Sequence, residues 1–349
     1  MNARTVAWSS RILLVLAGLW GASAAHADDQ WVGRKFMPKL SAKAMVGDKE
    51  MRAALHNVPF TVTKENGDWA WIGTAWVKKD QLVPLEQAAA YFTEHIHRNP
   101  NSVWGYDMRG TTWKDQGEFD KAIKDFSMII KYAPKDAWGY VARGSCHEAR
   151  GELEAALKDY AVAIRLAPKS PVPYIYRATV WGERNDFDKA IEDYEQAIRL
   201  DPQHSATAHF NRGLLNQRWG RYKEALDDYA QTLQAEPEHA GALACRARIR
   251  ATCPVDELRD GRRALEEAKQ ACESTHWGVE AWIDSLAAAY AETGDFEQAV
   301  KCQQKAIDLL GTTEHGLYTP AETKARLDLY KSGQPYRETP KAKLPARSR

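Results

Sequence analysis

The chain has 349 residues, of which 44% are hydrophobic and 27% are charged, an ordinary balance for a globular protein. Its formal net charge of +1 gives the chain as a whole no electrostatic preference for nucleic acid or for an anionic membrane. The length allows about two or three domains.

Residues 1–27 have the pattern of a secretory signal peptide. Two arginines, Arg4 and Arg11, precede the apolar run 12–20, and a small-x-small triplet suited to cleavage ends at Ala27. We therefore expect cleavage after Ala27, export to the periplasm or cell envelope, and no transmembrane segment in the mature chain. Because the apolar run is short for a bilayer span, an uncleaved anchor is the weaker alternative.

Residues 28–84 read as short strands, which predicts a small β-barrel. The pair Asn66-Gly67 predicts a hairpin turn, because both residue types tolerate a positive φ. Strand alternation should place at least two of four tryptophans inside the barrel, and the others could form a platform for a peptide or glycan. These tryptophans are Trp31, Trp69, Trp71 and Trp76.

The order of residues 66–72 and 75–77 resembles the distal half of a bacterial SH3-like domain. In that family a Gly-Asp-Trp turn leads into a strand and a Gly-Trp-Val element follows. Here Ala75 replaces the glycine of the second element. The resemblance implies an SH3-like fold and, since such domains often associate with cell-wall peptides, a contact with peptidoglycan.

A regular spacing dominates the rest of the chain. Five prolines follow one another at intervals of 34, 34, 34 and 35 residues, and an alanine column and an aromatic column keep the same period. A period of this length indicates stacked helical hairpins, in which each helix pair buries one face on its partner and another on the next pair. The columns are Pro100, Pro134, Pro168, Pro202 and Pro237; Ala88, Ala122, Ala156, Ala190 and Ala225; and Phe92, Phe126, Tyr160, Tyr194 and Tyr229.

The period divides residues 85–330 into helical units. Residues 85–100 match only the second helix of a unit, so they form a half-repeat that caps the stack and couples it to the barrel. About six repeats over 101–311 follow, the fifth with a longer segment between its helices. We expect a capping helix within 312–330 and a disordered basic tail over 331–349, where six basic residues face one acid.

These repeats match the tetratricopeptide (TPR) pattern, and residues 251–254, 259–261, 271–272 and 286–292 carry a pattern that recurs in one group. The chain resembles exported TPR proteins with an N-terminal SH3-like domain that are common in planctomycete-type bacteria. The resemblance implies a mainly α fold, a right-handed TPR superhelix (an α-solenoid) preceded by a small SH3-like β-barrel. It implies export and no catalytic activity.

The five cysteines are Cys146, Cys245, Cys253, Cys272 and Cys302, and none forms a Cys-x-x-Cys pair, which argues against a zinc site or a dithiol redox motif. Their odd number leaves at least one thiol or an intermolecular bond. The resemblance favours a disulfide between Cys253 and Cys272. A simple antiparallel helix pair argues against that bond, and a bond between Cys245 and Cys272 is the geometric rival.

An arginine on each first helix precedes an aspartate on the second helix by 16 residues in four repeats. These residues form either intramolecular pairs that join the helices or a ladder of arginines that binds anions. We favour the structural interpretation, because an arginine that is already paired has little free donor capacity. The pairs are Arg109 with Asp125, Arg143 with Asp159, Arg177 with Asp193, and Arg212 with Asp228.

In the TPR family the second, fifth, ninth and twelfth residues of each first helix line the concave face, which we call the inner-face positions. The lysine and asparagine pattern that clamps chaperone C-termini is missing here. An extended peptide or a helix with apolar anchors is the expected ligand, unless the aromatic residues pack between repeats. The candidate groove residues are Trp104, Asp107, Thr111, Trp138, Val141, Ser145, Ile175, Thr179, Phe210, Leu214 and Gln217, beside Lys114, Glu148, Val172 and Gly182.

The sequence contains no nucleophile elbow, phosphate loop, dinucleotide fingerprint or paired zincin histidines. We therefore predict no catalytic residues, no metal, no cofactor and no nucleic-acid partner. The expected function is a non-catalytic protein–protein interaction scaffold of the periplasm or cell envelope whose groove binds a peptide or helix. The alternatives are a cell-wall-binding module that acts through the SH3-like domain and an accessory subunit of an envelope enzyme complex.

Overall fold

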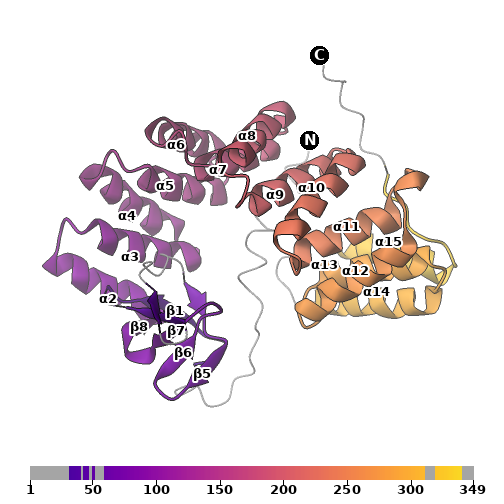
Figure 1. The fold of residues 1–349 in the computed structure, drawn as a ribbon, viewed down its shortest axis with the longest axis horizontal. Coiled ribbons are helices and arrows are strands. Elements are labelled where there is room, and N and C mark those ends of the chain that lie inside the picture. Colours follow the sequence, from indigo (N-terminus) through magenta and orange to yellow (C-terminus); the bar gives the residue numbers. More distant parts are fainter. Residues whose placement is uncertain (1–30, 41, 47–48, 52–58, 311–318, 340–349) are drawn as a thin grey trace. The chain divides into compact units, whose positions relative to one another are not determined.

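The computed structural model describes residues 31–40, 42–46, 49–51, 59–310 and 319–339. The predicted signal peptide and residues 340–349 lie outside this range. The described chain forms two compact units, which meet between Val180 and Trp181 within one helix. We describe each unit by itself, and Figure 1 gives the element labels.

The N-terminal unit begins with short strands in two antiparallel sheets. The order is β4-β1-β8 in the first sheet and β3-β2-β7-β6-β5 in the second. A hairpin joins β5 to β6 where the sequence predicts one, but its two-residue loop is Gly67-Asp68, with Gly67 at φ +55°, while Asn66 ends β5. The strands are β1 (Lys35–Pro38), β2 (Ala44–Val46), β3 (Lys49–Met51), β4 (Phe60–Thr61), β5 (Lys64–Asn66), β6 (Trp69–Trp71), β7 (Trp76–Lys78) and β8 (Leu82–Pro84), with the 3-10 turn η1 (Lys79–Gln81) before β8.

Small side chains, and not the tryptophans, fill the centre of this β region. Ala70 of β6 and Val77 of β7 face each other and are fully buried. Because side chains alternate along a strand, Trp69, Trp71 and Trp76 share the opposite face and are only half-buried. The prediction that at least two of the tryptophans lie inside is therefore wrong. Trp31 is also only partly buried, and it stacks on Phe36 with 4.4 Å between ring centroids.

The first helix, α2 (Leu85–Arg98), follows β8 directly and joins the β region to the helices. Its Ala88 and Phe92 are fully buried, together with Met37 of β1 and Met108 of α3, in one cluster. On the surface beside it, the Lys35 ammonium lies 2.9 Å from the Asp115 carboxylate. The half-repeat thus packs against strands on one side and against the first repeat on the other.

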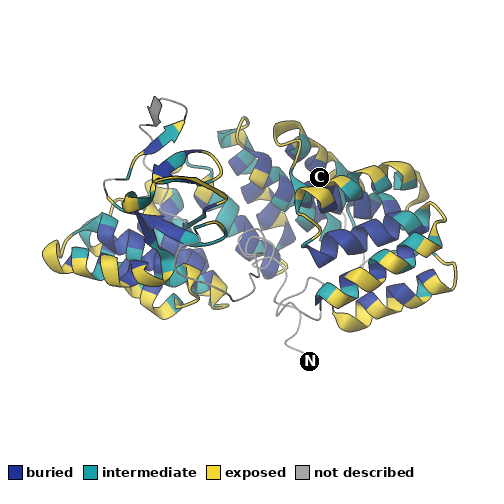
Figure 2. Ribbon diagram, turned by 90° about the horizontal axis from the view of Figure 1, so that it is seen from below, coloured by how far each residue is buried: buried dark blue, intermediate teal, exposed yellow. Residues whose placement is uncertain are grey.

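Helices in antiparallel pairs make up the rest of both units (Figure 1), and their bounds follow the period of the sequence. Figure 2 shows that buried residues gather on the helix faces that meet within each unit. The pairs are α3 (Val103–Asp115) with α4 (Phe119–Tyr132), α5 (Ala137–Ala149) with α6 (Leu153–Leu166), α9 (Ala206–Arg218) with α10 (Tyr222–Ala235), α11 (Ala240–Thr252) with α12 (Gly261–Ser274), and α13 (Glu280–Glu292) with α14 (Phe296–Leu310). Helix α7 (Val172–Glu183) contains the boundary between the units, and α8 (Phe187–Leu200) belongs to the C-terminal unit.

The turn inside each of the first four repeats contains a left-handed residue. Gly117, Gly151 and Gly220 adopt φ values of +77°, +75° and +74°, and Asn185 takes +63° at the equivalent place. The amide after Gly117 then donates to the carbonyl of Trp113, which closes the end of α3. The prolines act at the other end of the repeat, because a residue that precedes proline avoids the helical conformation.

A glycine column explains how closely the two helices of a repeat approach. A Cβ atom added to Gly144 would lie 2.6 Å from Cε1 of Tyr160, and one added to Gly110 or Gly213 would meet Phe126 or Tyr229 at 2.8 or 2.7 Å. Tyr160 has no room to move, since it is fully buried and its hydroxyl donates to Glu148 Oε2 at 2.8 Å. The small residues of the period therefore receive the aromatic rings of the second helices.

We expect Gly144→Ala to lower the free energy of unfolding by about 1–2 kcal/mol, because overpacking of the core outweighs the better helix propensity of alanine. Urea denaturation followed by circular dichroism measures this change. Gly182→Ala is the matched control, since its added Cβ would meet only the end of the Leu215 side chain, at 3.1 Å. Equal stability of the two variants would contradict the packing argument.

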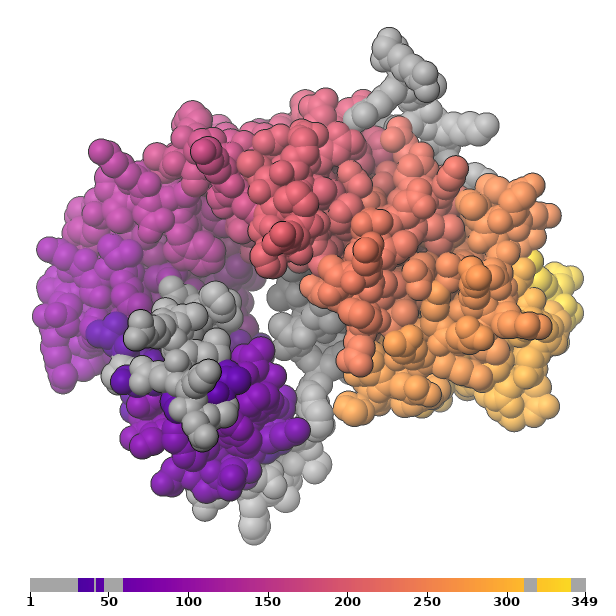
Figure 3. All heavy atoms as spheres, in the orientation of Figure 1, coloured from indigo at the N-terminus to yellow at the C-terminus, as the bar shows by residue number. Residues whose placement is uncertain are grey.

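The C-terminal unit departs from the regular pattern in two places. A 3-10 turn, η2 (Asp256–Leu258), lengthens the connection between α11 and α12. After α14, helix α15 (Pro320–Lys331) begins with a capping box between Thr319 and Glu322 and packs on α14. In Figure 3 the orange residues of α12 to α14 form one continuous surface.

The predicted disorder of the tail does not hold for residues 331–339. Lys331 ends α15, and Pro335 to Glu338 are half-buried against the repeats. Basic composition misled the prediction, because Arg337 and Glu338 have partners of opposite charge on α13 and α11.

Candidate binding surface

Bidentate ion pairs join the two helices of a repeat. Arg109 donates from Nε and Nη2 to the two oxygens of Asp125 at 2.9 and 2.7 Å. Arg143 binds Asp159 in the same way, at 2.8 and 2.7 Å. Arg212 Nη2 donates to Asp228 Oδ1 at 2.7 Å. Arg177 and Asp193 belong to different units.

In Arg109 and Arg143 the third guanidinium nitrogen, Nη1, reaches the preceding helical unit. Nη1 of Arg109 donates to Thr93 Oγ1 of α2 at 3.0 Å, and Nη1 of Arg143 donates to Ser127 Oγ of α4 at 3.2 Å. The hydrogen bonds that they donate to their aspartates raise the pKa of both arginines. Each guanidinium therefore connects three helices, and the anion-binding interpretation loses the donors that it requires.

A further ion pair between the two helices of a repeat was not predicted. Arg246 lies 34 residues after Arg212, and its Nη2 is 2.8 Å from Oε1 of Glu267 on α12. The spacing is 21 residues instead of 16, because η2 lengthens the connection. The period of the arginine column alone would have identified Arg246.

Polar inner-face residues of the first two repeats bind one another. Trp138 Nε1 donates to Asp107 Oδ1 at 2.8 Å, and Lys114 Nζ donates to Ser145 Oγ at 2.8 Å. Asp107 and Ser145 are buried, while 39% of Trp138 remains exposed. These contacts link α3 to α5 and leave the indole ring of Trp138 at the surface.

The other candidate groove residues differ in how far they are buried. Thr111, Val141 and Thr179 are buried, and Ile175 is half-buried. Trp104 packs edge-on against Phe92 with 5.5 Å between ring centroids, so it fills the contact between α2 and α3. Among the inner-face positions of this unit, Val172 is exposed to 40%.

The fourth repeat supplies mainly packing residues. Phe210 is only 5% exposed and lies against the ring of His239, with 4.6 Å between ring centroids. Gln217 accepts a hydrogen bond from the Tyr229 hydroxyl at 2.8 Å, and Leu214 is half-buried. The alternative that aromatic residues pack between helices therefore holds for Phe210 and Trp104.

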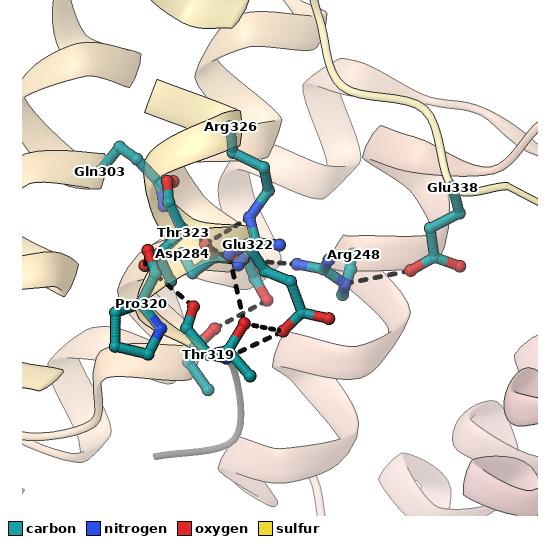
Figure 4. A network of polar contacts seen from close by, with 11 residues as sticks. Arg248, Asp284, Gln303, Thr319, Pro320, Glu322, Thr323, Arg326 and Glu338 are labelled. Carbon is teal, nitrogen blue, oxygen red and sulfur yellow. Dashed lines mark hydrogen bonds and ion pairs between the residues drawn. The ribbon is translucent and has the colours of Figure 1, made fainter. Parts of the chain in front are cut away.

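The inner-face positions of the last two repeats, which were not among the candidates, hold a buried charged cluster (Figure 4). Arg248 is the ninth residue of α11 and Asp284 the fifth of α13. Arg248 Nη1 donates to Asp284 Oδ2 at 2.6 Å, and Arg326 Nε of α15 donates to Oδ1 at 2.8 Å. Gln303 Nε2 of α14 also donates to Oδ1, at 2.8 Å. Extending the same helical positions to the last repeats would have revealed both residues.

An extended segment of the chain itself lies on this surface. Residues 334–339 follow α15, and Arg248 Nε donates to Oε1 of Glu338 at 3.1 Å. Figure 4 shows Arg248 between Asp284 and Glu338. The backbone amide of Glu338 donates to the carbonyl of Thr252, the last residue of α11, at 2.8 Å.

The predicted disulfide is not formed, since all five cysteines are free thiols. Cys253 caps the C-terminus of α11, whereas Cys272 lies near the far end of the antiparallel helix α12, and the two belong to different hydrophobic clusters. Burial raises the pKa of Cys146 to about 11 and those of Cys245 and Cys272 to about 12. These thiols are therefore protonated and act as core residues at neutral pH.

Models of the tetratricopeptide repeat match residues 108–171, 181–250 and 284–309. These ranges fall on the helix pairs described above. The chain is a tetratricopeptide repeat protein. No curated protein matches the chain.

Solved TPR structures resemble the chain at low identity. A chain of the APC/C hetero-tetramer Cut9–Hcn1 matches with a TM-score of 0.59 and 12% identity, over 70% of this chain and 46% of that one. YrrB, a TPR protein with an unusual peptide-binding site, matches at 0.37 and 18%, over 68% and 100% of the two chains. MamA from Desulfovibrio magneticus RS-1 matches at 0.39 and 20%, over 44% and 87%. Only the first score is high enough to inform the fold, and it supports a TPR solenoid.

TPR folds are typically scaffolds that bind proteins or peptides. No helix in the described part of the chain is long and apolar enough to cross a membrane. Within residues 31–339, apart from the undescribed gaps, no three potential metal-ligating side chains gather.

Proposed function

We propose that this TPR protein is a non-catalytic interaction scaffold that binds an extended peptide or a helix of a partner protein along its inner-face positions. Export to the periplasm or cell envelope is part of the proposal and rests on the sequence of residues 1–27. Trp138 and Val172 provide the main support. They occupy the first inner-face position of consecutive repeats, 34 residues apart, and are 39% and 40% exposed.

Both side chains are large, apolar and exposed. Large apolar side chains that recur on one face can anchor a peptide. Alternate side chains of an extended peptide can then pack on successive repeats. The indole of Trp138 is also oriented in advance, since its N–H is bound to Asp107. Little rotamer entropy would then be lost when a ligand packs on the ring.

We expect a double variant, Trp138→Ser with Val172→Ser, to lose at least 10-fold in the recovery of partner protein from envelope extract. The readout is quantitative affinity capture with residues 28–349. The matched control is Leu166→Ser, an equally exposed apolar residue at the end of α6 outside the inner-face positions. Both proteins must show the circular dichroism spectrum and melting curve of the wild type.

Loss of the same partners in the Leu166 control, or full recovery by the double variant, would exclude the inner-face positions of α5 and α7 as the binding surface. Recovery of peptidoglycan by all three proteins would instead favour the second candidate function, a wall-binding β region. That candidate is supported by the outward tryptophans of β6 and β7. The rings of Trp71 and Trp76 lie 5.3 Å apart, and the Lys78 ammonium lies 5.6 Å from the ring centroid of Trp69.

A further inference from the structure

The last turn of α15 directs the following residues onto the repeats. Gly333 takes φ +71°, and the amides of Gly333 and Gln334 donate to the carbonyls of Tyr330 and Leu329. This pair of bonds is the Schellman motif that ends a helix, and Pro335 prevents its continuation. The chain then runs extended along α11, and its side chains from Tyr336 to Glu338 make three different contacts.

The first contact is electrostatic. Two guanidiniums of the buried cluster, from Arg248 and Arg326, form ion pairs with the one carboxylate of Asp284. With the tail in place only 7% of the Arg248 side chain is exposed, so solvent screens its attraction to Glu338 weakly. Glu338 adds the second carboxylate. Burial raises the pKa of the nearby Tyr222 hydroxyl, and the negative charge of Glu338 raises it further. The surface is therefore built to accept an acidic side chain.

The second contact uses the C-terminus of α11. The last carbonyls of a helix have no partner inside the helix and attract positive groups. Arg337 Nη1 donates to the carbonyl of Ala251 at 3.2 Å, and it also lies 2.6 Å from Oε2 of Glu292 on α13. The amide of Glu338 uses the carbonyl of Thr252. A basic residue directly before the acidic one therefore fits this surface.

The third contact is aromatic. The ring of Tyr336 lies 5.8 Å from the guanidinium carbon of Arg248 and 5.6 Å from that of Arg326, and it packs on the cluster around Ala291. A guanidinium at this distance from an aromatic ring attracts it. The order aromatic, basic, acidic of residues 336–338 thus matches three neighbouring places on α11, α13 and α15.

The segment is held by few groups. Its residues from Pro335 to Glu338 are only half-buried, and Gln334 and Thr339 are exposed. Its backbone makes one hydrogen bond to α11, from Glu338. An extended segment that depends on three side chains and one backbone bond can leave without disturbing the helices beneath it.

We propose that residues 335–338 are a tethered ligand that occupies a peptide-binding site on the inner-face positions of the last two repeats. The partner is an extended protein segment with an aromatic, a basic and an acidic side chain in that order, and it binds by displacing the tail. This inference rests on the proposed function, since it names the partner chemistry for one part of the same face. The tail competes at an effective concentration on the order of millimolar, as for a short tether.

The test uses the full chain and a fluorescent peptide of residues 333–339. Fluorescence anisotropy should show at least 10-fold tighter binding of this peptide to the double variant Tyr336→Ala with Glu338→Gln than to the wild-type chain. The variant removes two of the three side-chain contacts of the tethered ligand and changes no residue of α11, α13 or α15. A peptide that carries Glu338→Gln should bind the same variant at least 10-fold more weakly.

Gln334→Ala is the matched control, because it changes an exposed residue of the same segment, and it should bind the peptide as the wild-type chain does. Equal affinity of the wild-type chain and the double variant, including no binding to either, would overturn the inference. The peptide assay reads only the C-terminal unit, whereas the capture experiment depends on Trp138 and Val172. Failure of the peptide with retained, Trp138-dependent capture would remove the inference and leave the proposed function standing.

Discussion

Replacing Asp284 with alanine is expected to lower the free energy of unfolding of the C-terminal unit by about 3–5 kcal/mol, because it removes the shared partner of two buried guanidiniums. Asp284 is fully buried and accepts bonds from Arg248, Arg326 and Gln303. These residues come from α11, α15 and α14, so one carboxylate holds together helices of three sequence regions. The loss corresponds to a decrease of roughly 10 °C in melting temperature for a unit of this size.

Thermal melts and hydrogen exchange measured by mass spectrometry test this expectation, since faster exchange should appear in α11, α13, α14 and α15. Glu297→Ala is the matched control. Its carboxylate also lies 2.6 Å from a cation, that of Lys301, but both side chains are exposed, to 77% and 59%. We expect the control to change stability by about 0.5 kcal/mol or less. Equal changes in the free energy of unfolding for the two substitutions would show that burial does not increase the contribution of the Asp284 cluster to stability.

Replacing Asp159 with alanine is expected to cost about 3 kcal/mol, the lower part of the range for a broken buried pair, because 25% of the Arg143 side chain is exposed to solvent. The substitution removes both acceptors of the bidentate bond and leaves Arg143 with the Ser127 hydroxyl. Because the same guanidinium touches α4, α5 and α6, the loss should loosen the contact between the first and second repeats as well.

Urea denaturation and hydrogen exchange over α4 to α6 measure this effect. Lys158→Ala changes the exposed neighbour on the same helix and should stay within about 0.5 kcal/mol of the wild type. An Asp159 variant that is as stable as the Lys158 control would return the arginine column to the anion-binding interpretation.

The period of the sequence predicted the helical fold because each column has a local steric cause. Gly144 must be small since Tyr160 packs against it, and Gly151 must be left-handed since the chain turns there. Such packing constraints act within one repeat and recur in the next, so a single sequence is enough to recognise them. The predicted fold class agrees with the TPR matches and with the Cut9–Hcn1 structure.

The sequence was less informative where contacts are not periodic. The tryptophans of β6 and β7 look like core residues by type, but pairing of Ala70 with Val77 turns them outward. The tail looks disordered by composition, but Glu338 meets Arg248 across 90 residues of sequence. A contact of that range leaves no local pattern, and for the same reason the occupied inner face of the last repeats could not be predicted.

The cluster that joins the β region to the first repeat has a consequence for how the chain folds. Met37 and Met108 share this cluster although they are 71 residues apart, whereas Gly144 and Tyr160, only 16 apart, are typical of contacts inside a repeat. Bringing distant segments together costs more chain entropy before any contact compensates for it, so such contacts form slowly. The repeats can begin to fold wherever a hairpin forms first, while the N-terminal junction waits for the β region and completes the N-terminal unit last.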